Sequence, residues 1–131
     1  MTITPKQGSR PTTVTVAVII LLISIVVGTI AIPFVGHFKN GLSYIFVAVF
    51  VSVQLLFVWF ISLGKNWARW IFIVSLALGL LMSFWTFRQL QAHSTAYLTF
   101  FYTQTVLHSV AAIALLLRPS NDWFRGYTNA A

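Results

Sequence analysis

The sequence predicts an all-α integral membrane protein, a bundle of four antiparallel transmembrane helices joined by short loops. Of the 131 residues, 59% are hydrophobic and only 7% are charged, whereas soluble domains have about 45–50% and about 25%. All nine charged residues lie outside four long apolar runs. Each run can cross a hydrocarbon core of about 30 Å as a helix, so a soluble globular fold is excluded.

The four apolar runs are the expected transmembrane helices. They cover residues 13–35, 41–63, 70–87 and 95–117. Membrane-spanning strands are the poorer alternative because they need about 9–11 residues of alternating polarity, a pattern that none of the runs shows. The connections are short, so consecutive helices are expected to be antiparallel. A flexible N-terminal tail, residues 1–12, and a cytoplasmic C-terminal tail, residues 118–131, complete the single domain.

The first run also has features of a secretory signal peptide, because Lys6 and Arg10 precede it. Its apolar stretch is longer than the about 7–15 residues of a signal sequence, and it continues to Pro33. We therefore expect a retained membrane helix, with Pro33 ending or kinking its last turn.

The distribution of Lys and Arg predicts the orientation in the membrane, because cytoplasmic loops carry an excess of both. The two tails and the loop between the second and third runs contain Lys6, Arg10, Lys65, Arg69, Arg118 and Arg125, and the other loops contain Lys39 and Arg88. This bias of six to two places both termini in the cytoplasm. We expect a multi-pass protein of the bacterial inner (plasma) membrane.

The ionisable residues exclude most catalytic and cofactor chemistry. The net charge is +7, but the basic residues are scattered, which argues against a nucleic-acid partner. No cysteine is present, and Asp122 is the sole acid, so neither thiolate ligands nor paired carboxylates exist. The histidines, His37, His93 and His108, lie at different depths and are not expected to bind a metal or haem. We therefore expect no catalytic residue, no cofactor and no enzymatic activity.

Two of the predicted helices carry stripes of small residues, which allow another helix to approach closely. The stripe of the third helix is Ser75, Gly79 and Ser83, and that of the first is Ala17, Ser24, Gly28 and Ala31. Helix packing within the chain is the expected role of both stripes. The functional alternative is that one stripe forms the seam of a homo-oligomer or binds a partner.

Three polar side chains lie inside the predicted spans. Gln54 is expected to form a hydrogen bond to a neighbouring helix, or else an inter-subunit contact. Gln104 and His108 lie one turn apart on the same face of the fourth helix. Since no span contains a carboxylate, we expect a neutral His108 bound to Gln104, Gln54 or a backbone carbonyl. Proton relay, metal binding and pH sensing are the alternatives.

Two segments on the predicted cytoplasmic side combine tryptophan with arginine, residues 64–70 and 118–126. Their interfacial residues are Lys65, Trp67, Arg69, Trp70, Asp122, Trp123 and Arg125. Tryptophan is typical of the membrane interface, and the basic residues can contact anionic lipid head groups. We expect Asp122 to contact Arg69 or Lys65 and so to join the two segments, the alternative being a solvated turn after Pro119.

The chain has four spans with short loops, and together with these two segments it resembles small bacterial inner-membrane proteins of unassigned function. In those proteins an Asn-Trp-Ala-Arg stretch, here residues 66–69, joins the second and third helices. The resemblance implies the four-helix architecture and no activity. The chain differs from the small multidrug resistance transporters, because their first helix carries a coupling glutamate and residues 13–35 contain no ionisable side chain.

The leading functional expectation is a non-enzymatic protein that acts through helix–helix association. It would be a homo-oligomer or an accessory subunit of a larger membrane assembly, for example in a protective or immunity role. The alternative is a channel or carrier for a small neutral or anionic solute, or for a lipid, along the face of Gln104 and His108. An enzyme acting on lipid is the third possibility, although no acid–base pair supports it.

Overall fold

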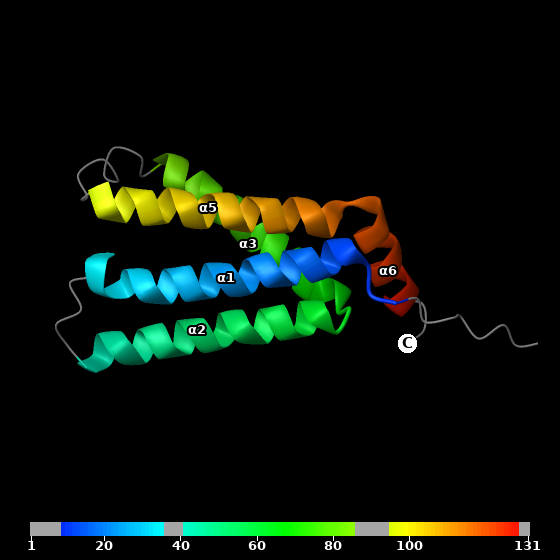
Figure 1. The fold of residues 1–131 in the computed structure, drawn as a ribbon, viewed down its shortest axis with the longest axis horizontal. Coiled ribbons are helices and arrows are strands. Elements are labelled where there is room, and N and C mark those ends of the chain that lie inside the picture. Colours follow the sequence, from blue (N-terminus) through cyan, green and yellow to red (C-terminus); the bar gives the residue numbers. More distant parts are fainter. Residues whose placement is uncertain (1–8, 36–40, 86–94, 129–131) are drawn as a thin grey trace, which may run out of the picture.

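The computed structural model describes residues 9–35, 41–85 and 95–128, which are almost entirely helical and contain no strand (Figure 1). The helices are α1 (Thr12–Val35), α2 (Gly41–Ser62), α3 (Asn66–Trp85), α5 (Thr95–Leu116) and α6 (Arg118–Thr128). All except α6 are long and apolar enough to cross a membrane. The all-α class and the four membrane-length helices are therefore confirmed.

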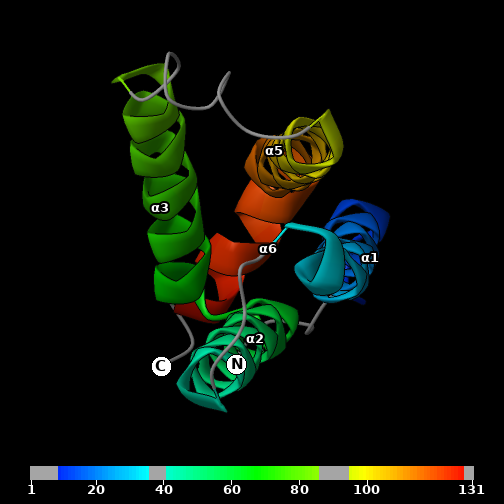
Figure 2. The same ribbon diagram turned by 90° about the vertical axis from the view of Figure 1, so that its left-hand side faces the viewer.

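Three of the long helices lie side by side, and α3 departs from them. In Figure 1, α1 lies between α2 and α5, and α1 packs against α5 along much of its length. Figure 2 views α1, α2 and α5 nearly end-on, whereas α3 is seen from its side. Helix α3 is thus steeply inclined to the other three.

The turn between α2 and α3 is a helix C-cap that requires glycine. Gly64 has a φ of 76°, a left-handed conformation that side chains with a Cβ rarely adopt. The backbone N–H of Lys65 donates to the carbonyl of Phe60 at 3.0 Å, which closes the last turn of α2. Helix α3 then begins at Asn66, four residues earlier than expected, so Arg69 lies in its first turn.

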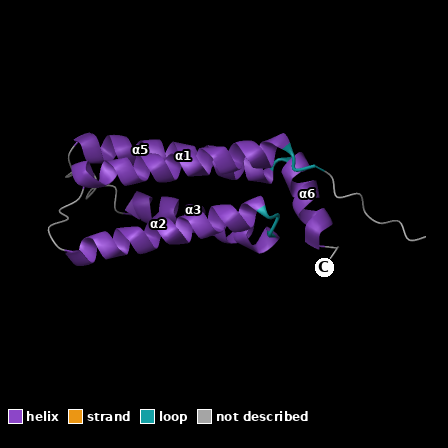
Figure 3. Ribbon diagram, turned by 60° about the horizontal axis from the view of Figure 1, so that its bottom comes forward, coloured by secondary structure: helices purple, strands orange, loops and turns teal. Residues whose placement is uncertain are grey.

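The packed core lies at one end of the molecule, where α1 begins, α2 ends, α3 begins and α5 ends. We call this the α6 end, because α6 covers it (Figures 1 and 3). The most deeply buried apolar side chains are Val14, Ala17, Ile61, Ala68, Ala111, Leu115 and Phe124. Away from this end the helices bury much less of their surface.

Residues 118–128 of the expected C-terminal tail form the helix α6, which the sequence analysis did not include among its helices. Pro119 is tolerated because it lies in the first turn, where the N–H groups have no intrahelical acceptor. The hydroxyl of Ser120 donates to the carbonyl of Ala114 at 2.7 Å and lies 2.7 Å from the hydroxyl of Thr13. Phe124 is fully buried. These tertiary contacts stabilise a helix that the composition of residues 118–128 does not predict.

Candidate functional site

A reciprocal pair of hydrogen bonds joins α1 to α5 at the small-residue stripe of α1. The hydroxyl of Ser24 donates to Oε1 of Gln104, and Nε2 of Gln104 donates to the backbone carbonyl of Ser24 at 2.7 Å. Gly28 leaves room for this amide, since a Cβ there would lie only 2.6 Å from Nε2 of Gln104. Ala17 and Ala31 of the same stripe are buried. The α1 stripe is therefore used inside the chain.

His108 extends this polar cluster by one turn. Its Nδ1 lies 2.8 Å from the backbone carbonyl of Gln104, and because a carbonyl only accepts, Nδ1 is the donor. In the uncharged imidazole Nε2 is then an acceptor. Nε2 lies 3.3 Å from the hydroxyl of Ser24, which donates its single proton to Gln104. The lone pair of Nε2 is thus left without a donor among the described residues.

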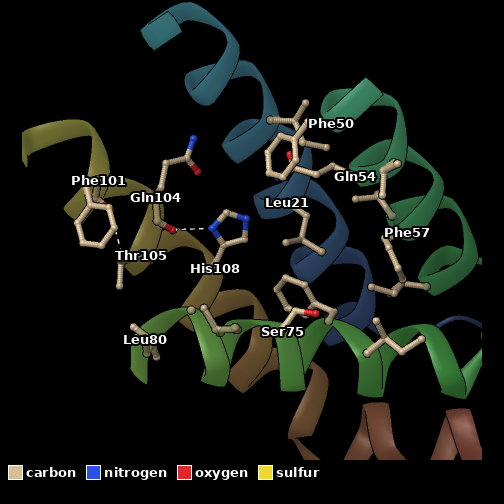
Figure 4. A pocket seen from close by; sticks show the side chains of 18 of the residues that line it. Leu21, Phe50, Gln54, Phe57, Ser75, Leu80, Phe101, Gln104, Thr105 and His108 are labelled. Atoms are coloured by element: carbon tan, nitrogen blue, oxygen red, sulfur yellow. Dashed lines mark hydrogen bonds between the residues drawn. The ribbon is translucent and has the colours of Figure 1, made fainter. Parts of the chain in front are cut away.

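A cavity of about 530 Å³ lies between α1, α2, α3 and α5 (Figure 4). Most of its wall is aliphatic or aromatic. The α3 stripe of Ser75, Gly79 and Ser83 lines it instead of packing against another helix of the chain. A Cβ added at Gly79 would meet no atom within 4 Å. Since Phe50 in the opposite wall is 64% exposed, the cavity opens sideways on the surface of the spans.

Several polar groups in the cavity wall already have partners. The hydroxyls of Ser83 and Thr105 donate to backbone carbonyls of their own helices at 2.7 and 2.9 Å. The side chains of Gln54 and Ser75 form no hydrogen bond within the described part of the chain. Together with Nε2 of His108, they give the cavity three polar groups with unused hydrogen-bonding capacity.

These three groups lie at similar distances along their own helices from the α6 end. Gln54 is eight residues from the last residue of α2, Ser75 is nine residues from the first residue of α3, and His108 is eight residues from the last residue of α5. Each therefore lies about 12–14 Å along its helix from the α6 end. Figure 4 shows them around one space, contributed by three different helices.

A second buried polar site, at the α6 end, centres on Arg69. Its side chain is only 2% exposed. Both Nη1 and Nη2 donate to Oδ1 of Asn121, each at 3.2 Å, which joins α3 to α6. The guanidinium carbon lies 4.8 Å from the ring centre of Phe124 and 5.3 Å from that of Trp70, within the range of cation–π attraction.

The expected contact of Asp122 with Arg69 or Lys65 is wrong. Asp122 is exposed, and no ion pair joins these three described residues. The two segments do meet, but through the neighbouring Asn121. Because α6 is helical, Asn121 and Phe124 at i and i+3 share its inner face, while Asp122 is rotated about 100° away from Asn121.

The remaining residues of the predicted interface lie around this contact. Trp67 packs against Phe60, with ring centres 5.1 Å apart, and keeps half of its surface exposed. Trp123 is half-buried, and Lys65 and Arg125 are exposed. Their side chains are thus accessible at the α6 end of the spans.

Sequence reasoning missed the residues of α6 that hold it in place. Phe124 is spaced at i+4 from Ser120 and at i+3 from Asn121, so it lies on the same side of the helix as each of them. That spacing was the available signal, but a polar segment beginning with Arg118 and Pro119 does not by itself predict a packed helix.

Among the described residues, no group of His, Cys, Asp or Glu is placed to hold a metal ion. His37 and His93 lie outside the described residues. Comparisons with known protein families, curated proteins and solved structures find no match to this chain. The resemblance carried by residues 66–69 and 118–126 stays a prediction.

Proposed function

We propose that this chain is a non-enzymatic, multi-pass protein of the bacterial inner membrane that binds a small, neutral, membrane-soluble molecule in the cavity between its spans. The lengths and apolar character of the four long helices support the location. The bias of Lys and Arg supports antiparallel spans with cytoplasmic termini. The observation that carries the proposal is that Gln54, Ser75 and His108, from three different helices, bring unused polar groups to one largely apolar cavity.

The size of the cavity favours a small molecule over a helix of another protein. Sites for small ligands have volumes of about 300–1,000 Å³, and this cavity has about 530 Å³. One turn of a helix, treated as a cylinder about 10 Å wide and 5.4 Å tall, fills roughly 420 Å³. The cavity thus holds little more than one turn of a partner helix.

The composition of the wall favours a neutral occupant. All charged side chains of the sequence lie outside the predicted spans, and the cavity is lined by uncharged residues. An anion or cation would lose its hydration without gaining a countercharge. A continuous polar path along α5 has little support, because Gln104 is engaged with Ser24.

Filling the cavity tests this function. Ser75→Trp places a large ring in the cavity, and Val106→Trp places the same ring on the exposed outer face of α5. Both variants and the wild type would be purified from membranes in mild detergent, checked for matched thermal stability, and extracted with organic solvent for mass spectrometry. We expect a neutral molecule with the wild type and Val106→Trp, and its depletion from Ser75→Trp. Identical extracts from all three proteins would overturn the proposal.

Association through α3 is a second candidate function, favoured by the open stripe around Gly79. The partner would be a second copy or a larger membrane assembly, with immunity as one instance. Because the chain has no cysteine, Gly79→Cys introduces a single thiol, with Val106→Cys as the control on α5. Oxidation in native membranes should cross-link Gly79→Cys alone to a copy or a partner. Equal cross-linking of both variants, or none, would reject this function.

We also propose that the α6 end contacts anionic lipid head groups. Lys65, Arg118 and Arg125 are exposed there, and each basic residue near an anionic surface contributes about 1 kcal/mol. Vesicles with and without anionic lipid would test this, since replacing Arg118 and Arg125 by glutamine in a peptide of residues 118–128 should weaken its binding to the anionic vesicles only.

A further inference from the structure

We infer that the occupant of the cavity is an uncharged amphiphile, an apolar molecule whose polar head is a hydroxyl group held by Gln54, Ser75 and His108. This inference rests on the proposed function and names the chemical class of its ligand. The three residues come from α2, α3 and α5, and all line the cavity (Figure 4).

The donors and acceptors in the wall define the head group. Nε2 of the uncharged His108 needs a donor, because Nδ1 holds the ring proton against the carbonyl of Gln104. The amide of Gln54 and the hydroxyl of Ser75 each offer both a donor and an acceptor. A hydroxyl meets all of these needs, since it donates its proton to His108 and accepts from Gln54 or Ser75. A ketone or an ether has no proton to give.

Polar groups without hydrogen-bond partners in an apolar environment also favour the binding of a ligand that supplies those partners. A side-chain amide or hydroxyl without a partner in an apolar medium costs free energy, and polar groups inside spans are usually paired or functional. Within the described part of the chain, Gln54 and Ser75 have no hydrogen-bond partner. Ser75 is exposed and Gln54 is half-buried beside the cavity, so a ligand hydroxyl can reach both side chains and supply the missing bonds within the spans.

The lining of the cavity indicates where the apolar part of the ligand would lie. Farther from the α6 end along α2, α3 and α5, the wall continues with Phe50, Leu80 and Phe101. Gly79 leaves open space along α3. The head therefore lies nearer the core, and the apolar part extends along Phe50, Leu80 and Phe101.

Three photoreactive probes with the same chain test the head group. Each carries a diazirine on a long alkyl chain, and they differ in ending as a primary alcohol, its methyl ether or a carboxylate. The full-length protein in liposomes would be irradiated with each probe, and labelled peptides would be identified by mass spectrometry. We expect the alcohol to label cavity residues about tenfold more than the ether, as one to two hydrogen bonds would give.

Matched variants test whether Ser75 and Gln54 cause the preference for the alcohol probe. Ser75→Ala removes an unused hydroxyl from the cavity wall, whereas Ser83→Ala removes one that already donates to its own helix. Gln54→Leu removes the amide and keeps the volume. Ser75→Ala and Gln54→Leu should lower alcohol labelling toward that of the ether without changing ether labelling, while Ser83→Ala should behave as the wild type.

The outcomes separate this inference from the proposed function. Cavity labelling by alcohol and ether to the same extent, or strongest labelling by the carboxylate, would overturn the hydroxyl head and leave cavity binding intact. Labelling spread evenly over the outer faces of the helices, with none of the probes preferring cavity residues, would overturn both. A preference for alcohol that Ser75→Ala and Gln54→Leu leave unchanged would overturn the assigned residues.

Discussion

Replacing Asn121 is the most direct test of how α6 is attached. Asn121→Leu keeps the size of the side chain and removes the single oxygen that accepts from both Nη1 and Nη2 of Arg69. Since Arg69 is 2% exposed, water cannot easily replace the lost acceptor. The guanidinium would then be left with only the faces of Trp70 and Phe124.

The expected magnitude follows from this geometry. Hydrogen bonds from charged donors contribute about 1.5–3 kcal/mol. The two N–H groups share one oxygen, and Asn121 is itself half-buried, so we expect Asn121→Leu to lower the free energy of unfolding by about 2 kcal/mol. Asn121→Asp should raise it by roughly 1 kcal/mol, because a carboxylate can accept both N–H groups in a bidentate pair. The desolvation of a second charge limits that gain.

Equilibrium unfolding by SDS in mixed micelles measures these changes, followed by the fluorescence of the five tryptophans. A double-mutant cycle with Arg69→Leu isolates the pair, and we expect an interaction energy of about 2 kcal/mol. Asp122→Asn is the control, because Asp122 is exposed and unpaired with Arg69. A loss of stability in Asp122→Asn as large as that in Asn121→Leu, or no interaction energy in the cycle, would refute the reasoning.

Three further predictions concern packing and orientation. Gly28→Ala should destabilise the protein by about 1 kcal/mol because the amide of Gln104 must move, whereas Gly79→Ala should be neutral or slightly stabilising in the same unfolding assay. Phe124→Ala should cost about 3–5 kcal/mol and speed hydrogen exchange in α6, because this ring is fully buried. Fusions after Ala131 should activate a cytoplasmic reporter and leave a periplasmic one silent, and the reverse would contradict the orientation.

The spans could be predicted because length and apolar composition decide whether a helix can cross a membrane. The inclination of α3 could not, since it depends on how side chains from several helices fit together. The core at the α6 end holds the start of α3 through Ala68 and Arg69, which are both buried. Nothing in the sequence of residues 70–85 indicates that the rest of this helix diverges.

The contacts of the polar residues could be predicted only where the partners lie close together in the sequence. The spacing of Gln104 and His108 places them one turn apart, and the structure has His108 against the backbone carbonyl of Gln104. Ser24 was considered only for its small size, and its bonds to Gln104 connect residues 80 positions apart in the chain. Neither this pairing nor the missing partner of Gln54 could be inferred from spacing along a helix.

The two small-residue stripes show why a pattern alone does not decide a role. In sequence they are nearly equivalent, yet Gly28 lies directly against the amide of Gln104 and Gly79 faces open space. On α1 the absent side chain makes room for a long polar residue of the facing helix, so the stripe stabilises the fold. On α3 no facing helix approaches, because α3 is inclined, and the same small residues enlarge a cavity. The inclination of α3 thus leaves a packing motif in the wall of the cavity, which Gln54, Ser75 and His108 also line.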